Sequence, residues 1–115
     1  MEYNRGEVVL VLFPDSNLKT AKRRPALVVQ ANSLETGLPQ TIVAMITSNM
    51  TRANHPSRIE IKRNSPEGKE MGILTDSVVM TDNLVTVLEN EIDRVIGKCR
   101  LMKKVCLALK HTLGI

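Results

Sequence analysis

The amino-acid sequence predicts a mainly β fold, a small barrel or rolled sheet with one amphipathic helix at its C-terminal end. Two patterns carry this prediction. Through most of the chain, short apolar stretches alternate with turn residues, as in short strands joined by turns. From about Cys99 onward, the apolar residues recur at steps of three and four, which is the period of a helix. The 115 residues fit a single domain spanning 1–115.

The first half of the chain is predicted to form three strands joined by two loops. Residues 6–13 are a continuous apolar run, too short for a helix, which indicates a strand buried on both faces. Residues 14–23 are polar and predict a loop longer than a hairpin needs, a length typical of functional loops. The second strand, 25–30, begins at a proline, where a lost backbone donor is tolerated. Turn residues in 32–40 predict another loop before a third strand at 41–47.

The second half is predicted to contain shorter strands. Residues 50–56 are a polar connection, and 58–62 alternate between apolar and charged side chains, the pattern of a strand with one face in water. Residues 64–71 are charged and contain Pro and Gly, so a loop is expected there. Two short strands, 77–81 and 84–88, are expected on either side of a corner.

The C-terminal part is predicted to be a last strand, 94–98, and then a helix closed by Gly114. One face of this helix carries an apolar stripe formed by Leu101, Met102, Val105, Cys106, Ala108, Leu109 and Leu113. Cys99 and Cys106 are seven residues apart, which in a helix is two turns or about 10 Å, too far for a disulfide. We therefore expect both thiols to be reduced packing residues.

The composition argues against several classes of protein. The sequence has no run of 18 apolar residues and no signal-peptide pattern, so we expect a soluble, cytoplasmic protein that makes no membrane contact. No Cys/His cluster has the spacing of a metal site, so neither a metal nor another cofactor is expected. The two aromatic residues, Tyr3 and Phe13, are too few for a nucleic-acid binder built on aromatic stacking.

Positive charge is concentrated in the first half of the chain. The net charge is +4; residues 15–63 carry eight Lys and Arg against three Asp and Glu, whereas residues 64–93 carry one against seven. A basic segment of this kind is typical of a surface that binds a polyanion. Ordinary surface charge that keeps the protein soluble explains it equally well.

Five segments in order resemble the MazF/PemK/Kid toxins. Residues 5–8 read Arg-Gly-Glu-Val, and 23–29 read Arg-Arg-Pro-Ala-Leu-Val-Val, a basic segment that leads into Arg-Pro and an aliphatic strand. Residues 46–49 (Ile-Thr-Ser-Asn) resemble the family's second motif, and residues 76–79 followed by 81–86 resemble its third. Residues 94–98 before the terminal helix resemble the closing strand. Each segment is weak alone, but the ordered set spans nearly the whole chain and is specific.

The resemblance implies an SH3-like barrel of the MazF/PemK/CcdB-like kind with a C-terminal amphipathic helix, dimeric through a broad face. It implies a sequence-specific, metal-independent endoribonuclease, an mRNA interferase that cuts single-stranded RNA by attack of a 2′-hydroxyl on the adjacent phosphate and is neutralised by a cognate antitoxin. Two positions depart from part of the family. Met80 stands where some members have an Arg, and Leu18 stands near the place of a loop His. These departures leave open which residues are the general base and the general acid.

Arg24 and Thr47 are the candidate catalytic residues. A guanidinium makes bidentate contacts with phosphate oxygens, and Thr47 at a strand end offers a hydroxyl to the phosphate or to the 2′-hydroxyl. Ser48 is a candidate second hydroxyl, and Asp82 a candidate to orient Arg24 or read a base edge, although turn formation explains both equally well. His55 is a candidate base or RNA contact, with an exposed loop His as the alternative.

The candidate RNA-binding residues are basic or polar side chains near the catalytic positions: Lys19, Lys22, Arg23, Asn49 and Arg52. In a homodimer, RNA is expected to lie in a groove between the loops 14–23 and 48–56. An acidic and apolar antitoxin segment would occupy the same groove. Part of the apolar surface of strand 8–13 and of the terminal helix is expected to be buried between subunits.

The sequence leaves two other functions open. CcdB-like proteins share the barrel and poison gyrase without enzymatic activity, and the ending Leu113-Gly114-Ile115 weakly resembles theirs. A relative with a decayed site would bind RNA without cutting it, which Met80 and the missing loop His permit.

Overall fold

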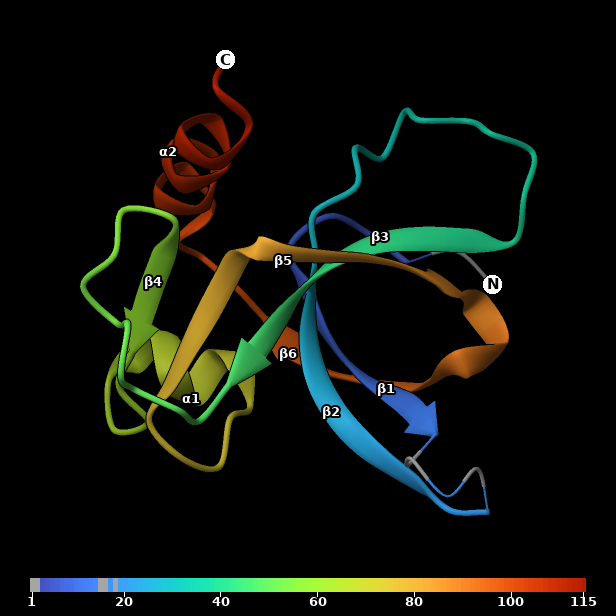
Figure 1. Ribbon diagram of the computed structural model, residues 1–115, viewed down its shortest axis with the longest axis horizontal. Coiled ribbons are helices and arrows are strands. Elements are labelled where there is room, and N and C mark those ends of the chain that lie inside the picture. The colour runs from blue at the N-terminus through green and yellow to red at the C-terminus, as the bar shows by residue number, and fades with distance from the viewer. Residues whose placement is uncertain (1–2, 15–16, 18) are drawn as a thin grey trace.

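The computed structural model describes residues 3–14, 17 and 19–115, and its architecture is mainly β (Figure 1). The described strands are β1 (Glu7–Pro14), β2 (Ala21–Val28), β3 (Gln40–Thr47), β4 (Arg58–Ile61), β5 (Ser77–Leu88) and β6 (Ile92–Lys98). The described helices are α1 (Pro66–Met71), α2 (Met102–Leu113) and a 3₁₀ turn, η1 (Glu89–Glu91).

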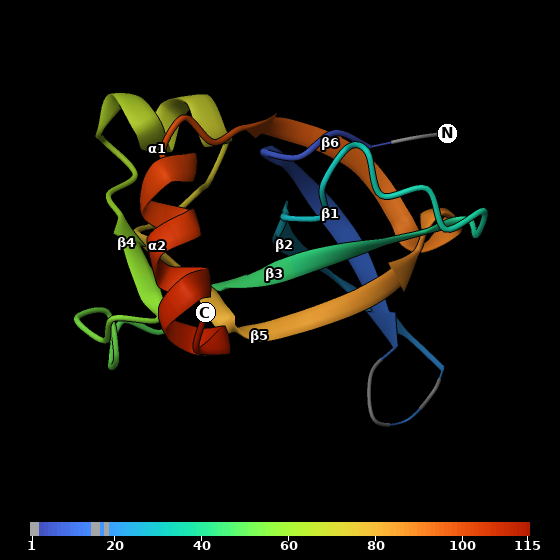
Figure 2. The ribbon, with the colours of Figure 1, turned by 90° about the horizontal axis from the view of Figure 1, so that it is seen from above.

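The strands form one antiparallel sheet in the order β4-β5-β3-β2-β1-β6. The sheet curls, so that α2 lies over one part of it while β1, β2, β3, β5 and β6 wrap around the other (Figures 1 and 2). Strands β4 and β6 are its edges, and α1 packs against β6. The predicted mainly β fold with a C-terminal helix is confirmed, as a curled sheet that stays open between these edges in the described residues.

Both faces of the central strands are buried, because successive side chains of a strand point in opposite directions. Val8 and Leu27 belong to an apolar cluster that α2 covers with Val105. Val9 and Val28 belong to a second cluster on the opposite face, inside the curl. The prediction that the first strand is buried on both faces is confirmed. Its valines are buried within one chain, so they give no argument for a second subunit.

The loop expected over 14–23 overlaps a strand at its end, and its residues 15, 16 and 18, Leu18 among them, lie outside the described residues. β2 begins at Ala21 and pairs with β1 as a hairpin in which Arg24 lies opposite Val11. The polar, basic composition predicted a loop, but pairing with β1 imposes an extended backbone while the charged side chains remain exposed. Arg24 is therefore held within a strand, not at the junction of a loop and a strand.

The charged segment expected as a loop over 64–71 contains the helix α1. Ser65 caps it, since its hydroxyl oxygen accepts a hydrogen bond from the Gly68 N–H at 3.0 Å. Pro66 occupies the first turn, and Gly72 ends the helix with φ of 75°. Ser before Pro and a closing Gly are start and stop signals. The prediction was wrong because a helix of six residues is too short to show an apolar period.

β5 replaces the two short strands predicted around a corner, and it bends at that corner (Figure 1). Its register against β3 shifts there: Leu84 lies opposite Ala44, whereas Met80 lies opposite Met45. Residues 81–83 are therefore left without a partner in β3. The corner that the sequence predicted is a break in pairing inside one strand.

The C-terminal helix α2 runs from Met102 to Leu113, and Gly114, whose φ is 70°, caps its end. Arg5 ties the N-terminal turn to this helix, because its guanidinium donates hydrogen bonds to the Val29 carbonyl and, at 3.0 Å, to the Cys106 sulfur. Both cysteines are free thiols, as predicted. In the described part of the chain, no helix has the length and apolarity needed to cross a membrane.

Candidate functional site

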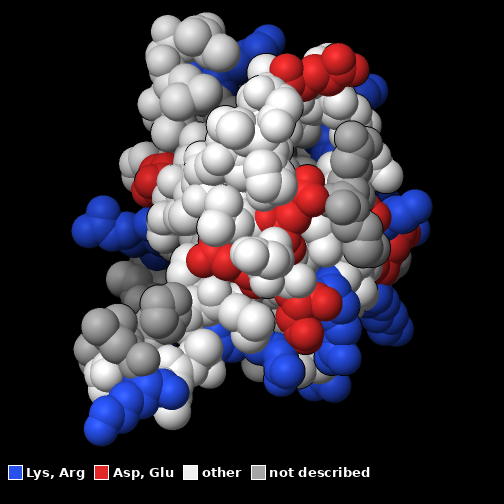
Figure 3. All heavy atoms as spheres, turned by 90° about the vertical axis from the view of Figure 1, so that its right-hand side faces the viewer, with Lys and Arg blue, Asp and Glu red and all other residues white. Residues whose placement is uncertain are grey.

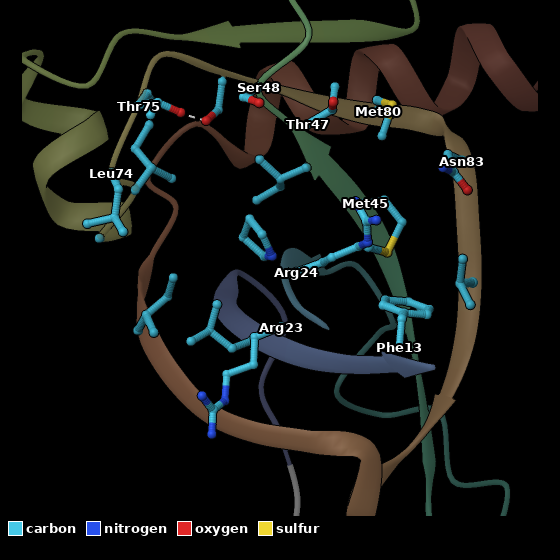
Figure 4. A pocket seen from close by; sticks show the side chains of 18 of the residues that line it. Phe13, Arg23, Arg24, Met45, Thr47, Ser48, Leu74, Thr75, Met80 and Asn83 are labelled. Atoms are coloured by element: carbon cyan, nitrogen blue, oxygen red, sulfur yellow. Dashed lines mark hydrogen bonds between the residues drawn. The ribbon is translucent and has the colours of Figure 1, made fainter. Parts of the chain in front are cut away.

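A pocket of about 730 Å³ lies where β2 and β3 stop pairing. The last pair that joins them is Ala26 with Met45, and extending this register by two residues sets Arg24 across from Thr47. Beyond this point β2 pairs with β1 alone, while β3 continues along β5. The divergence leaves a wedge between the strand ends, and both Arg24 and Thr47 line it (Figure 4).

Arg24 enters this pocket from β2, and Met45 of β3 lines the same pocket (Figure 4). The Arg24 side chain is exposed, and it makes no ion pair with any residue that the structure describes. Its neighbour Arg23 differs, because the Nε of Arg23 lies 3.0 Å from Oδ2 of Asp93 in β6. A guanidinium without a carboxylate partner keeps its donors available for an anionic ligand.

Thr47 and Ser48 bring two hydroxyl groups to the pocket at the end of β3 (Figure 4). The Thr47 Oγ1 accepts a hydrogen bond from the Asn49 N–H at 3.1 Å, which leaves its own hydrogen able to donate to a ligand. The Asn49 Oδ1 accepts from the N–H of Thr51 at 3.0 Å and from its hydroxyl at 2.6 Å. Asn49 thus fixes the turn that presents the two hydroxyls, and it does not itself line the pocket.

The chemistry of the pocket suits an anion. Three arginines line it together with four hydroxyl residues, namely Arg23, Arg24, Arg94, Thr47, Ser48, Thr75 and Ser77. The described residues that line it include no Asp, Glu or His. Guanidinium and hydroxyl groups bind phosphate oxygens, whereas divalent cations take carboxylate or imidazole ligands. Over residues 3–14, 17 and 19–115, no three His, Cys, Asp or Glu side chains are grouped to hold a metal ion.

Asp82 lies outside the pocket and is not brought to Arg24. It accepts two hydrogen bonds from Arg58 in β4, each at 3.2 Å. Partial burial acts to raise the pKa of this carboxyl, but the hydrogen bonds and the charge of Arg58 outweigh burial and lower the pKa below its ordinary value. The structure therefore gives Asp82 a partner that the sequence did not predict, and this pair joins β4 to the corner of β5.

His55 is also placed away from the pocket. Its Nδ1 accepts a hydrogen bond from the Ser57 N–H at 3.1 Å and lies 2.7 Å from the Ser57 hydroxyl oxygen. Its ring meets the edge of the His111 ring, with centroids 6.1 Å apart. These contacts join the loop after β3 to α2.

The basic candidates other than Arg23 are not among the residues that line the pocket. Lys19 and Lys22 are exposed on the hairpin of β1 and β2, and Arg52 is exposed in the loop before β4. Figure 3 shows Lys and Arg side chains gathered at the lower end of one face, below a band of Asp and Glu. The hairpin extends toward that lower end in Figure 1.

Sequence reasoning did not single out three residues that line the pocket, Phe13, Asn83 and Arg94. Arg94 carried a usable signal, since it begins a predicted apolar strand much as Arg24 precedes another. Phe13 looked like an ordinary core residue and Asn83 like an ordinary corner residue. No local pattern marks these two, because long-range strand pairing brings them to the pocket.

Residues 4–113 match the family model for the PemK-like, MazF-like toxin of type II toxin-antitoxin systems. The chain is 29% identical to endoribonuclease MazF2 of Mycobacterium bovis, and the alignment covers 100% of both proteins. The same identity and coverage hold for endoribonuclease MazF6 of Mycobacterium tuberculosis.

Solved structures share this fold. An endoribonuclease in complex with its cognate antitoxin, from a mycobacterial species, superposes with a TM-score of 0.73 at 22% identity, covering 99% of this chain and 97% of that one. A chain of a MazE-MazF crystal structure from Deinococcus radiodurans superposes with a TM-score of 0.75 at 17% identity, covering 98% and 97%. At these identities the likeness establishes the fold alone.

Proposed function

The chain belongs to the family of PemK-like, MazF-like toxins of type II toxin-antitoxin systems, and on that premise we propose that it is an endoribonuclease that cuts single-stranded RNA at specific sequences without a metal ion. The curated relatives that it matches over their full length are named endoribonucleases. One observation carries the proposal. Arg24 and Thr47 line one pocket at the point where their strands diverge.

In the proposed reaction, the 2′-oxygen of one nucleotide attacks the adjacent phosphorus, and the bond from phosphorus to the 5′-oxygen of the next nucleotide breaks. The 2′-hydroxyl loses a proton and the departing 5′-oxygen gains one, which leaves a 2′,3′-cyclic phosphate and a 5′-hydroxyl. Negative charge builds up on the phosphate oxygens in the transition state, and the guanidinium of Arg24 stabilises it. Thr47 orients the phosphate through its free hydroxyl hydrogen, and Ser48 supplies a second hydroxyl.

We assign binding of the RNA backbone to the basic residues in and around the pocket: Arg23, Arg94, Lys19, Lys22 and Arg52. Contacts of this kind fix the position of the strand but carry no sequence information. They make affinity fall as salt concentration rises, because each neutralised phosphate releases counterions.

We propose further that the protein acts as a homodimer and that an antitoxin blocks the pocket. Leu107, Leu113 and Ile115 are 68%, 55% and 83% exposed, so apolar surface on and after α2 remains for a second subunit. A structure of similar fold contains an endoribonuclease with its cognate antitoxin. A peptide segment with acidic and apolar side chains matches a pocket lined by arginines and by aliphatic residues.

Primer extension on a long RNA incubated with the purified protein tests this function. We expect discrete cuts at a recurring short sequence, equally strong in EDTA, and no cut where the nucleotide that supplies the 2′-hydroxyl is replaced by its deoxy form. Activity that chelation removes and a divalent ion restores would contradict the metal-free reaction. Normal cutting of the deoxy substrate would contradict attack by the 2′-oxygen. Binding without cutting would indicate a decayed site, and inhibition of gyrase in a parallel supercoiling assay would indicate a CcdB-like toxin.

A further inference from the structure

At the corner of β5, three consecutive residues, 81–83, have side chains in three different environments. Residues 81–83 have no partner in β3, because the register shifts there. Thr81 is fully buried, Asp82 binds Arg58 on β4, and Asn83 lines the pocket that holds Arg24. The corner therefore delivers one amide group to the candidate active site.

Two anchors hold this corner in place. Thr81 Oγ1 donates a hydrogen bond to the Ser57 carbonyl at 2.6 Å and lies 2.8 Å from the hydroxyl oxygen of Thr112 in α2. The Thr81 N–H donates to the same Ser57 carbonyl at 3.0 Å. Asp82 accepts its two hydrogen bonds from Arg58, each at 3.2 Å. Because the two residues before Asn83 are fixed, its backbone is positioned before any ligand arrives, which reduces the entropy lost on binding.

The side chain of Asn83 is available to a ligand. It is exposed, and it forms no hydrogen bond within the described part of the chain. Phe13, Met45 and Met80 lie on the same side of the pocket in Figure 4. Met45 is buried, whereas Phe13 and Met80 are half-buried, so the Phe13 ring and the Met80 thioether offer a surface against which an unstacked base can pack.

We propose that Asn83 reads one base of the RNA, the base next to the phosphate that Arg24 holds; this inference rests on the proposed nuclease function. An amide presents a donor beside an acceptor and so pairs with a base edge that does the same, adenine being its usual partner. The arginines of the pocket are donors only. Among the described residues that line the pocket, Asn83 alone offers a fixed donor and acceptor side by side.

The test is to sequence the cut ends of a randomised RNA pool after digestion by the wild-type protein, Asn83→Ala and Asn83→Asp. Asn83→Ala is expected to keep cutting while losing its preference at a single position by roughly 5- to 150-fold, the usual discrimination of a bidentate contact. A carboxylate only accepts hydrogen bonds, so Asn83→Asp is expected to turn the preference toward guanine, whose N1–H and N2–H₂ are adjacent donors. Asn64→Asp is the matched control, because Asn64 is exposed, does not line this pocket and undergoes the same change of charge.

The outcomes separate this assignment from the nuclease function. If the wild-type protein cuts no RNA, the proposed function itself fails. If both Asn83 variants cut with the wild-type preference, the nuclease stands and Asn83 does not read a base. Loss of cutting on every sequence by a folded Asn83→Ala protein would also overturn the assignment, because it would tie Asn83 to the chemistry instead of to one base. A changed preference in Asn64→Asp would show that added negative charge, and not the pocket amide, sets it.

Discussion

Replacing Arg24 with Ala is expected to remove RNA cleavage while leaving the fold intact. The side chain is exposed and has no ionic partner in the described chain, so the free energy of unfolding should change by no more than about 0.5 kcal/mol. Loss of a group that stabilises transition-state charge typically lowers the rate about 100- to 1000-fold. Arg24→Lys keeps the charge but loses the bidentate geometry, so its cleavage rate should fall between that of the wild-type protein and that of Arg24→Ala.

The assay is single-turnover cleavage of a short RNA that carries one mapped site, together with urea unfolding of each variant. Arg23→Ala is the control on the same strand. That substitution removes an ion pair with Asp93 in which the Arg23 side chain is 62% exposed, worth at most about 1 kcal/mol. Because Arg23 is assigned to the RNA backbone, this variant should bind RNA more weakly, with the larger deficit at low salt and a shallower dependence on salt, and with a nearly unchanged rate at saturating protein.

Two results would contradict the proposed role of Arg24. Cleavage by Arg24→Ala within about threefold of wild type would remove the residue from catalysis. An unfolding free energy lowered by well over 1 kcal/mol would contradict the premise that the exposed Arg24 side chain does not support the fold.

Gly97→Ala is expected to lower the free energy of unfolding by about 1–3 kcal/mol, because the added Cβ would meet the backbone of Met71 in α1. Urea unfolding measures this change, and an unchanged midpoint would contradict the close approach of the two backbones. Iodoacetamide should label Cys106 well before Cys99 in the folded protein, since burial raises the pKa of the Cys99 thiol and excludes the reagent. Mass spectrometry of the peptides checks that order, and equal labelling would mean that Cys99 is accessible. Light scattering at micromolar protein should report about twice the chain mass if the protein is a homodimer. A monomer that still cuts RNA would rule out the proposed dimer.

Local elements could be predicted wherever enough residues repeat one pattern. The apolar run of β1, the alternation of β4 and the stripe of α2 each show the period of their structure over several residues, and the structure contains all three. Two predictions were wrong for a common reason: the start of β2 and the loop expected where α1 lies. The basic start of β2 is extended because β1 pairs with it, and α1 is too short to display a period. In both places a contact or a cap decided the conformation, and composition did not.

For the candidate site, the sequence by itself determined the kinds of groups present: an Arg before a proline, and a Thr and a Ser at a strand end, in a chain that is poor in aromatic residues and carries net positive charge. Only the tertiary structure decided which of them meet. Arg24 and Thr47, 23 residues apart in the numbering, share a pocket because β2 and β3 part at Ala26 and Met45. Asp82 accepts a hydrogen bond from Arg58, and its neighbour Asn83 lines the pocket in its place. These outcomes follow from strand register, in which a shift of one residue moves a side chain to the opposite face. Register is set by the pairing of segments that are distant in the sequence, so it cannot be predicted from a short stretch of neighbouring residues.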